Sequence, residues 1–228
     1  MGVVVVAAGS GTRLGADRPK AFVELAGVTL LGHALRGVLA CGPDEVVVVV
    51  PAALVDEARG IAQALVGDRS ATVVVVAGGA ERTDSVAAGL APLSAAVDVV
   101  LVHDAARCLT PVAVFERVLA ALAAGAKGAI PGVPVVDTIK VVDAEGVITS
   151  TPLRDGLRAV QTPQGFDRAV LTAAHAAGSL ATDDAALVES LGHDVLVVAG
   201  DPRALKITTA DDLAHAERLL TGRSSALP

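Results

Sequence analysis

The chain has 228 residues, and its 18 basic and 25 acidic side chains give it a formal net charge of −7. This length allows one large α/β domain or two small ones, and either can bury a substantial core. The negative balance argues against a general nucleic-acid binder, which needs a basic face. Any anion site must therefore come from a local cluster of cations.

The cysteines, the hydropathy pattern and the N-terminal sequence predict where the protein works. Cys41 and Cys108 are the only cysteines, too few for a disulfide framework or a zinc site, so a reducing compartment is the default. The longest apolar run, 46–55, is interrupted by Pro51 and has about half the length of a membrane span. The N-terminus lacks the basic region of a signal peptide. We therefore expect a cytoplasmic protein without a membrane or nucleic-acid partner.

The first stretch with clear chemical meaning runs from Val3 to Lys20. The β-branched run 3–6 predicts a buried parallel strand. A strand that opens into a glycine-rich loop offers backbone N–H groups to phosphates, and Arg13 and Lys20 can neutralise charge there. These residues predict a nucleotide triphosphate site. Small residues that let a ligand approach the backbone closely form the loop: Ala7, Ala8, Gly9, Ser10 and Gly11.

Two common phosphate-binding motifs fit this stretch poorly. The dinucleotide fingerprint G-x-G-x-x-G can start at Gly9, but Leu14 occupies the third glycine position. The P-loop needs a lysine directly after its last glycine, whereas Gly15 and Lys20 lie well apart. An NAD-linked dehydrogenase and a P-loop enzyme are therefore disfavoured. A plain strand-to-loop turn with two surface cations stays open as an alternative.

Apolar spacing predicts alternating strands and helices along most of the chain. Helices are expected over 28–40, 54–65, 111–124 and 167–176. Strands are expected at 3–6, 45–50, 72–76, 98–102, 128–132 and 194–198. Thr209 and Asp212 form a capping signature for a terminal helix. This alternation predicts an α/β fold with a parallel sheet and helices on both of its faces.

Two further polar segments follow predicted strands, at the sheet edge where open α/β sheets bind ligands. In segment 78–85, two glycines allow close approach and Ser85 can donate a hydrogen bond from the next helix; a plain capping loop is the alternative. In segment 103–107, Asp104 suits a place near Mg²⁺ on a triphosphate, and Arg107 suits a phosphate contact. His103 faces the other way on the strand, so we expect it to pack or to support the site.

The alternation breaks after residue 132. Segments 135–142 and 147–151, joined by a turn at 143–146, predict a β-hairpin. Such a hairpin interrupts the parallel order, so we expect it to leave the main sheet as an arm. Taken alone, an exposed hairpin of this kind is more often solvated surface.

Together these motifs resemble a known family. A-A-G-x-G-x-R followed by P-K is similar to the signature of sugar-nucleotide and polyol-phosphate nucleotidyltransferases. The segments G-G-x-x-R-x-x-S, H-D-A-A-R and T-P-Q-x-F then follow in the order found in 2-C-methyl-D-erythritol 4-phosphate cytidylyltransferases, and the match spans residues 3–220. Ala80 replaces an acid of some members, which would leave only a backbone contact there, and Asp184 replaces a glutamate.

The resemblance implies a fold and a set of ligands. It implies a single domain over residues 1–228, with a Rossmann-like, mostly parallel sheet of the GT-A-like nucleotidyltransferase type. An arm at about 134–160 would join a homodimer whose active site borrows residues from the partner. The donor would be CTP, the acceptor methylerythritol phosphate and the cofactor Mg²⁺ or another divalent cation, in the synthesis of isoprenoid precursors without mevalonate.

The resemblance also implies residue roles. The implied catalytic residues are Arg13, Lys20, Arg154 and Lys206. The implied CTP-binding residues are Ala7, Ala8, Gly9, Ser10, Gly11, Gly79, Ala80, Ser85, Asp104 and Ala105. The implied contacts to the acceptor's phosphate and polyol are Arg107, Thr138, Arg154, Thr162 and Lys206. Asp104 is the implied metal contact, directly or through water.

The implied reaction is in-line attack of the acceptor phosphate on the α-phosphorus of CTP, which releases pyrophosphate. A phosphate monoester is already a nucleophile at neutral pH, so positioning and charge neutralisation carry the catalysis. Three alternatives stay open at this point. They are another polyol phosphate acceptor such as ribitol 5-phosphate, a nucleotide with another base, and a non-catalytic nucleotide-binding protein.

Overall fold

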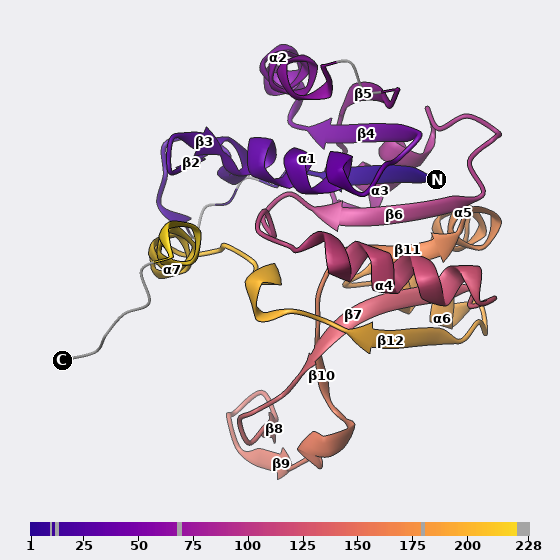
Figure 1. Cartoon of the computed structure of the whole chain (residues 1–228). Coiled ribbons are helices and arrows are strands. Elements are labelled where there is room, and N and C mark those ends of the chain that lie inside the picture. Colours follow the sequence, from indigo (N-terminus) through magenta and orange to yellow (C-terminus); the bar gives the residue numbers. More distant parts are fainter. Residues whose placement is uncertain (10, 12–13, 68–69, 179–180, 223–228) are drawn as a thin grey trace.

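A mixed sheet forms the central layer of the computed structural model, which describes residues 1–9, 11, 14–67, 70–178 and 181–222. The sheet order is β10-β7-β11-β6-β1-β4-β5, with β12 paired to β7 (Figure 1). Strands β10 and β11 run antiparallel to their neighbours, and the other pairings are parallel. The strands are β1 (Gly2–Val6), β4 (Glu45–Val50), β5 (Thr72–Ala77), β6 (Val99–Asp104), β7 (Gly128–Pro134), β10 (Arg158–Val160), β11 (Gln164–Asp167) and β12 (Val195–Ala199).

Helices cover both faces of this sheet. On one face lie α1, α2 and α4, and on the other lie α3, α5 and α6 (Figure 1). The bounds are α1 (Leu30–Ala40), α2 (Val55–Val66), α3 (Arg82–Leu90), α4 (Val112–Ala123), α5 (Arg168–Ala176), α6 (Asp184–Ser190) and α7 (Ala210–Thr221). Short elements are the hairpin β2 (Glu24–Leu25) and β3 (Val28–Thr29) and the 3₁₀ turns Lys20–Phe22, Ala52–Leu54, Arg154–Gly156 and Pro202–Ala204. Within the described part of the chain, no helix is both long and apolar enough to span a membrane.

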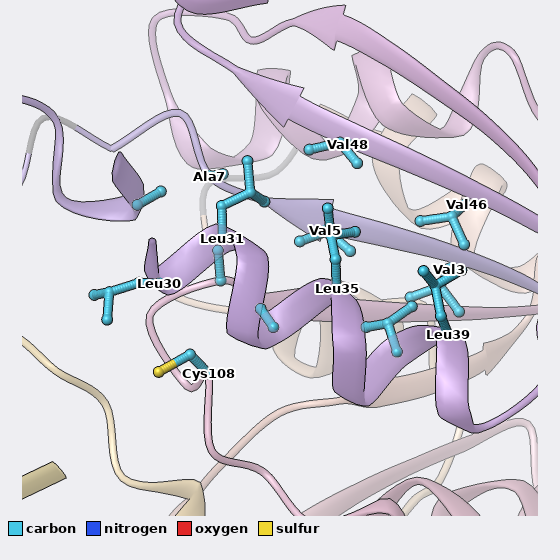
Figure 2. Packing of buried hydrophobic residues seen from close by; sticks show 14 of the residues in the cluster. Val3, Val5, Ala7, Leu30, Leu31, Leu35, Leu39, Val46, Val48 and Cys108 are labelled. Carbon is cyan, nitrogen blue, oxygen red and sulfur yellow. The ribbon is translucent and has the colours of Figure 1, made fainter. Parts of the chain in front are cut away.

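The valine runs explain how the two cores form. Side chains alternate across a strand, so Val46 and Val48 of β4 join the core under α1, while Val47 and Val49 join the core under α3. Figure 2 shows Leu35 of α1 beside the β1 and β4 valines of the first core. Each fully buried aliphatic side chain contributes about 1.5–3 kcal/mol of transfer free energy. Because β4 is buried on both faces, its positions favour apolar residues, and its sequence is an unbroken apolar run after Glu45.

The structure confirms the predicted alternation, and its described residues include four strands that the pattern did not indicate, β2, β3, β10 and β11. Strand β4 has the predicted bounds, and most other elements start or end within two residues of the expected position. Strand β11 was missed. It is inserted between β6 and β7 and includes Gly165, where a Cβ would lie 2.5 Å from Val118 Cγ1 and 2.7 Å from Leu101 Cδ2. Close packing of α4 on this strand thus requires glycine at this position. Because glycine has no side chain, the strand lacks the apolar pattern that would have predicted it.

The arm is less regular than predicted. It leaves the sheet between β7 and β10 (Figure 1), and pairing is confined to β8 (Val141–Val142) and β9 (Ile148–Ser150). An isolated two-stranded hairpin is marginally stable because it has little surface to bury. The exposed side chains of β8 and β9 fit that limit.

Candidate active site

A cleft of about 220 Å³ lies at the carboxyl ends of β1, β5 and β6. Because these strands run parallel to β4 or to one another, the loops that follow them meet at one edge of the sheet. The cleft brings together residues from four predicted segments. Its lining residues are Val6, Ala7, Ala8, Gly9, Lys20, Ala21, Gly79, Ala80, Glu81, Arg82, Ser85, Asp104, Ala105, Ala106 and Lys206.

The first loop folds back over Lys20. Gly11 has a φ of +68°, and a Cβ at this position would collide with the Cβ of Lys20. Gly11 therefore does not line the cleft itself but lets the loop pass close behind a residue that does. Lys20 begins a 3₁₀ turn directly after Pro19. Two further predicted residues, Ser10 and Arg13, lie outside the described part of the chain.

The second loop packs tightly against the first. A Cβ on Gly78 would lie 2.6 Å from Ala8 Cβ and 2.8 Å from Ser85 Oγ, so only glycine permits this approach. The loop leads into α3, whose N-terminus is closed by a reciprocal capping box between Glu81 and Asp84. Because segment 79–82 lines the cleft, the positive end of the α3 dipole faces it and favours a bound anion.

Asp104 stands at the centre of the cleft's charged groups. Its Oδ2 lies 2.7 Å from Lys206 Nζ, and its Oδ1 lies 3.9 Å from Arg82 Nε. Burial alone raises the pKa of the Asp104 carboxyl, but the charges of Lys206 and Arg82 outweigh burial and lower the pKa below its usual value. Asp104 is therefore an ionised carboxylate with cations on two sides.

Arg82 is a charged residue of the cleft that our sequence analysis missed. Its Nη2 donates to Asp184 Oδ2 at 2.7 Å, and the other oxygen of Asp184 lies 2.9 Å from His175 Nε2. Burial raises the pKa of the Asp184 carboxyl, but the hydrogen bond from His175 and the charge of Arg82 lower it overall. Arg82 was visible within segment 78–85, but its buried partner lies 102 residues further along the chain.

His103 lies behind the site rather than in it. The imidazole is 1% exposed and packs against the Phe115 ring, with 5.1 Å between the ring centroids. Burial lowers its pKa to about 4, so the ring is neutral near pH 7 and cannot serve as a cation for phosphate. This placement agrees with the packing or supporting role expected from the sequence.

Two residues expected to bind the acceptor are engaged within the chain. Thr162 is buried, its Oγ1 accepts a hydrogen bond from the Asp104 N–H at 3.0 Å, and it lies 3.1 Å from His103 Nδ1. Arg107 donates to the Ala204 carbonyl at 2.7 Å and to the Val160 carbonyl at 3.1 Å. Neither lines the cleft; both support segments that do.

Thr138 and Arg154 lie on the arm, outside the cleft of the same chain. Arg154 donates to the Val136 carbonyl at 2.8 Å, and both Thr138 and Arg154 are exposed. The structure therefore does not bring these two predicted residues together with Lys20 and Lys206.

The charged groups of the cleft fit a metal ion that is bound mainly by the phosphates of a substrate and only in part by the protein. Within the described ranges, no group of three or more His, Cys, Asp or Glu side chains could form a protein-only metal site. Mg²⁺ is commonly bound through one or two carboxylates together with substrate phosphates. Asp104, an ionised carboxylate in the cleft, suits that arrangement.

A mixed, mostly parallel sheet carries a small-residue loop, a helix N-terminus, two lysines and the ionised carboxylate of Asp104 at one edge. This is the arrangement expected of a nucleotidyltransferase from the sequence resemblance. The family model described as 2-C-methyl-D-erythritol 4-phosphate cytidylyltransferase (IspD) matches residues 1–222, and the chain belongs to this family. The family resemblance predicted from the sequence is thus confirmed.

Individual relatives agree with this family. The 2-C-methyl-D-erythritol 4-phosphate cytidylyltransferase of Nocardia farcinica is 53% identical over 225 residues, which cover 97% of this chain and 94% of the relative. That of Rhodococcus jostii is 53% identical, covering 95% of this chain and 93% of the relative.

Solved structures confirm the predicted fold class. The 4-diphosphocytidyl-2C-methyl-D-erythritol synthase of Anaerococcus prevotii superposes with a TM-score of 0.84 at 28% identity, covering 96% of this chain and 97% of that one. The 2-C-methyl-D-erythritol 4-phosphate cytidylyltransferase of Thermus thermophilus gives a TM-score of 0.75 at 36% identity, covering 96% of this chain and 98% of that one.

Proposed function

We propose that the protein transfers the cytidylyl group of CTP to 2-C-methyl-D-erythritol 4-phosphate, giving 4-diphosphocytidyl-2-C-methyl-D-erythritol and pyrophosphate in the non-mevalonate synthesis of isoprenoid precursors. The observation that carries this proposal is the convergence of the small-residue loop, Lys20, the α3 N-terminus, Asp104 and Lys206 on one cleft. Membership of the cytidylyltransferase family supports the same donor and acceptor.

The residues divide the work by position. Ala7, Ala8, Gly9 and the α3 N-terminus would receive the triphosphate, and Lys20 would neutralise charge as pyrophosphate leaves. Ser10 and Arg13 are assigned to the same site from the sequence alone. Gly79, Ala80, Ser85 and Ala105 would hold the nucleoside. Lys206 would hold the attacking phosphate close to the α-phosphorus. This catalysis needs positioning and electrostatic stabilisation but no general base.

Mg²⁺ is part of the proposal, with Asp104 as the residue that would hold it, directly or through water. When bound, the ion would neutralise triphosphate oxygens. The fit rests on the ionised state of Asp104 and on its place beside the predicted phosphate site. Another divalent cation of similar preference for oxygen ligands would satisfy the same geometry.

The proposed working unit is a homodimer of single-domain chains joined through the arm at about 134–160. Large apolar side chains on the arm are exposed, and exposed apolar clusters mark association surfaces. Arg154, Thr138 and the arm that carries them would then complete the acceptor site of the other chain. The apolar arm residues are Val136, Ile139, Val141, Val142, Val147, Ile148 and Leu153.

Pyrophosphate release from CTP and Mg²⁺, measured with and without methylerythritol phosphate, tests the proposal. We expect release only when the acceptor is present. Release with ribitol 5-phosphate instead would keep the reaction and change the acceptor, and equal use of UTP and ATP would overturn the choice of CTP. CTP binding without release in any mixture would favour a non-catalytic nucleotide-binding protein.

A further inference from the structure

Three of the eight buried polar side chains of the described residues belong to one short segment, 161–164. This segment links β10, the strand that returns from the arm, to β11. A buried polar group without a partner destabilises the fold, so the partners of these side chains indicate their purpose. The buried polar and charged residues are Ser85, His103, Asp104, Thr110, Gln161, Thr162, Gln164 and Asp184.

Gln161 holds the segment that carries Lys206. Its Nε2 donates to the Asp201 carbonyl at 2.8 Å, and its Oε1 accepts from the Asp201 N–H at 3.0 Å. One side chain thus satisfies both main-chain groups of a residue, as a neighbouring strand would. A Cβ on Gly200 would collide with Gln161 Oε1 and lie 3.1 Å from the Gly132 carbonyl carbon, so the observed position of the Gln161 amide requires glycine here.

The same segment is tied down again on both sides of Lys206. Arg107 donates to the Ala204 carbonyl at 2.7 Å, and the Ile207 N–H donates to the Ala106 carbonyl at 2.9 Å. The chain between Asp201 and Ile207 therefore has a fixed path past Asp104. This path places the Lys206 ammonium 2.7 Å from the Asp104 carboxylate.

Gln164 holds the segment that positions the other cation. Its Nε2 donates to Asp183 Oδ2 at 2.8 Å, and its Oε1 accepts from the Ala185 N–H at 3.2 Å. These two bonds grip α6 on either side of Asp184, the fully buried carboxylate that holds Arg82. Arg82 in turn lies 3.9 Å from Asp104 Oδ1, whereas Lys206 pairs with the other carboxylate oxygen.

We propose that Gln161 and Gln164 are positioning residues that set the two cations around Asp104. Gln161 acts through Asp201 on Lys206, and Gln164 acts through Asp184 on Arg82. Thr162, between them, fixes the Asp104 main chain through its hydroxyl. Lys and Arg side chains have many rotamers and must be held in one of them, and a small misplacement of a charge reduces catalysis strongly. The activity readout of this inference rests on the proposed function.

Crossed double-mutant cycles test the two routes separately. We expect Gln161→Met to lower kcat about tenfold or more in the wild-type background and to have little further effect beside Lys206→Ala. Its effect should stay additive with that of Arg82→Ala. Gln164→Met should show the reverse pattern. Additive effects in both cycles would overturn the proposal, because a general loss of stability would not couple a glutamine to one of the two cations and not to the other.

Two variants guard against a trivial loss of folding. Val38→Ala removes buried volume from α1, at a site fully buried in the core, and provides a matched loss of stability that should couple to neither cation. Gly200→Ala presses on the Gln161 amide from the other side and should reproduce the coupling of Gln161→Met to Lys206. Urea unfolding of each variant gives the free energy with which the kinetic effect is compared.

A second readout does not need enzymatic activity. The sequence has four lysines, so reductive ¹³C-methylation, which keeps the charge, gives few NMR signals, and Lys206→Arg identifies that of Lys206. Gln161→Met should shift the Lys206 signal and leave those of Lys127 and Lys140 in place. An unmoved Lys206 signal would contradict the proposal even in an active enzyme. A shifted signal in a protein without pyrophosphate release would instead contradict only the proposed function.

Discussion

The cleft and the arm hold their functional side chains in opposite ways. Asp104 in the cleft is 7% exposed and is fixed by ion pairs, whereas Leu153 on the arm is 88% exposed. The cleft thus obtains its order from the fold of one chain. The arm is linked by local hydrogen bonds, but most of its side chains are exposed and it presents apolar surface. Under the proposed function, the donor half of the site would be preorganised and the acceptor half would depend on assembly.

The largest effect is expected from removing a cation of the cleft. Lys20→Ala should lower kcat about 10²–10³-fold, far more than it raises KM, because the proposed role of the lysine is to neutralise charge that grows in the transition state. Steady-state kinetics with both substrates measures the two parameters. Lys127→Ala is the control, since Lys127 forms an exposed ion pair with Asp167. A change in KM alone would make Lys20 a binding residue only.

The arm should respond to a charge on its apolar surface. Replacing Leu153 or Ile148 by Asp should weaken dimerisation at least about tenfold, because an interface would have to bury an unpaired carboxylate. Analytical ultracentrifugation measures the dimer, and the same variants should lose activity while CTP binding is retained. The exposed Leu220 on α7 offers a control, Leu220→Asp. Unchanged activity in a fully monomeric variant would refute a shared acceptor site.

Burial behind the cleft should also appear as a pH dependence of the free energy of unfolding. His103 has a pKa of about 4 in the folded protein, against about 6.5 when unfolded. Its stabilising contribution is complete above pH 6.5 and is lost as the pH falls toward 4, because the unfolded chain then binds more protons. From pH 6.5 to 5 this amounts to about 2 kcal/mol.

Urea unfolding of wild type and His103→Gln at pH 7, 6 and 5 measures this contribution. The variant should show a clearly flatter dependence, since the glutamine does not titrate and can still reach the Thr162 hydroxyl. Parallel curves for the two proteins would assign the acid sensitivity to other groups.

The sequence predicts local order well where one residue type decides the outcome. The valine run of β4 could be assigned to its end residues because only a doubly buried strand is apolar throughout. The α7 cap was correctly predicted from Thr209 and Asp212, which form the expected capping box. Strand β11 was missed because glycine, here Gly165, disfavours a strand assignment. The need for glycine comes from its contacts with Val118 and Leu101.

The residues of the site also could be predicted where the signal is local and were missed where it depends on distant residues. The small-residue loops and Asp104 can be recognised from a few neighbouring residues. These local motifs therefore predicted that the segments line a cleft, as they do in the structure. The roles of Arg82 and Gln161 depend on Asp184 and Asp201, which are distant in sequence and come near only in the folded protein. Arg107 looked like a phosphate contact because its type suits one, but it donates to two main-chain carbonyls.

The smallest effect concerns a turn outside both regions. Ala26 has a φ of 51° in the two-residue turn between Leu25 of β2 and Val28 of β3, and Gly27 follows with a φ of 77°. Positive φ at both positions is typical of a type I′ turn, which favours Asn-Gly and Gly-Gly. A Cβ in this conformation costs about 1–2 kcal/mol, while a new glycine loses about 0.4–1 kcal/mol more entropy on folding.

Ala26→Gly should therefore raise the free energy of unfolding by about 0.5–1 kcal/mol, measured by urea unfolding. Ala26→Asn should act in the same direction, because asparagine tolerates left-handed backbone without the added flexibility of glycine. Neither variant should change kcat, KM or the dimer, since the turn contributes no side chain to the cleft and lies far from the arm in sequence. A stabilised variant with altered activity would show that cleft geometry depends on global stability, and the preorganisation argued for the cleft would then not be local to its own hydrogen bonds.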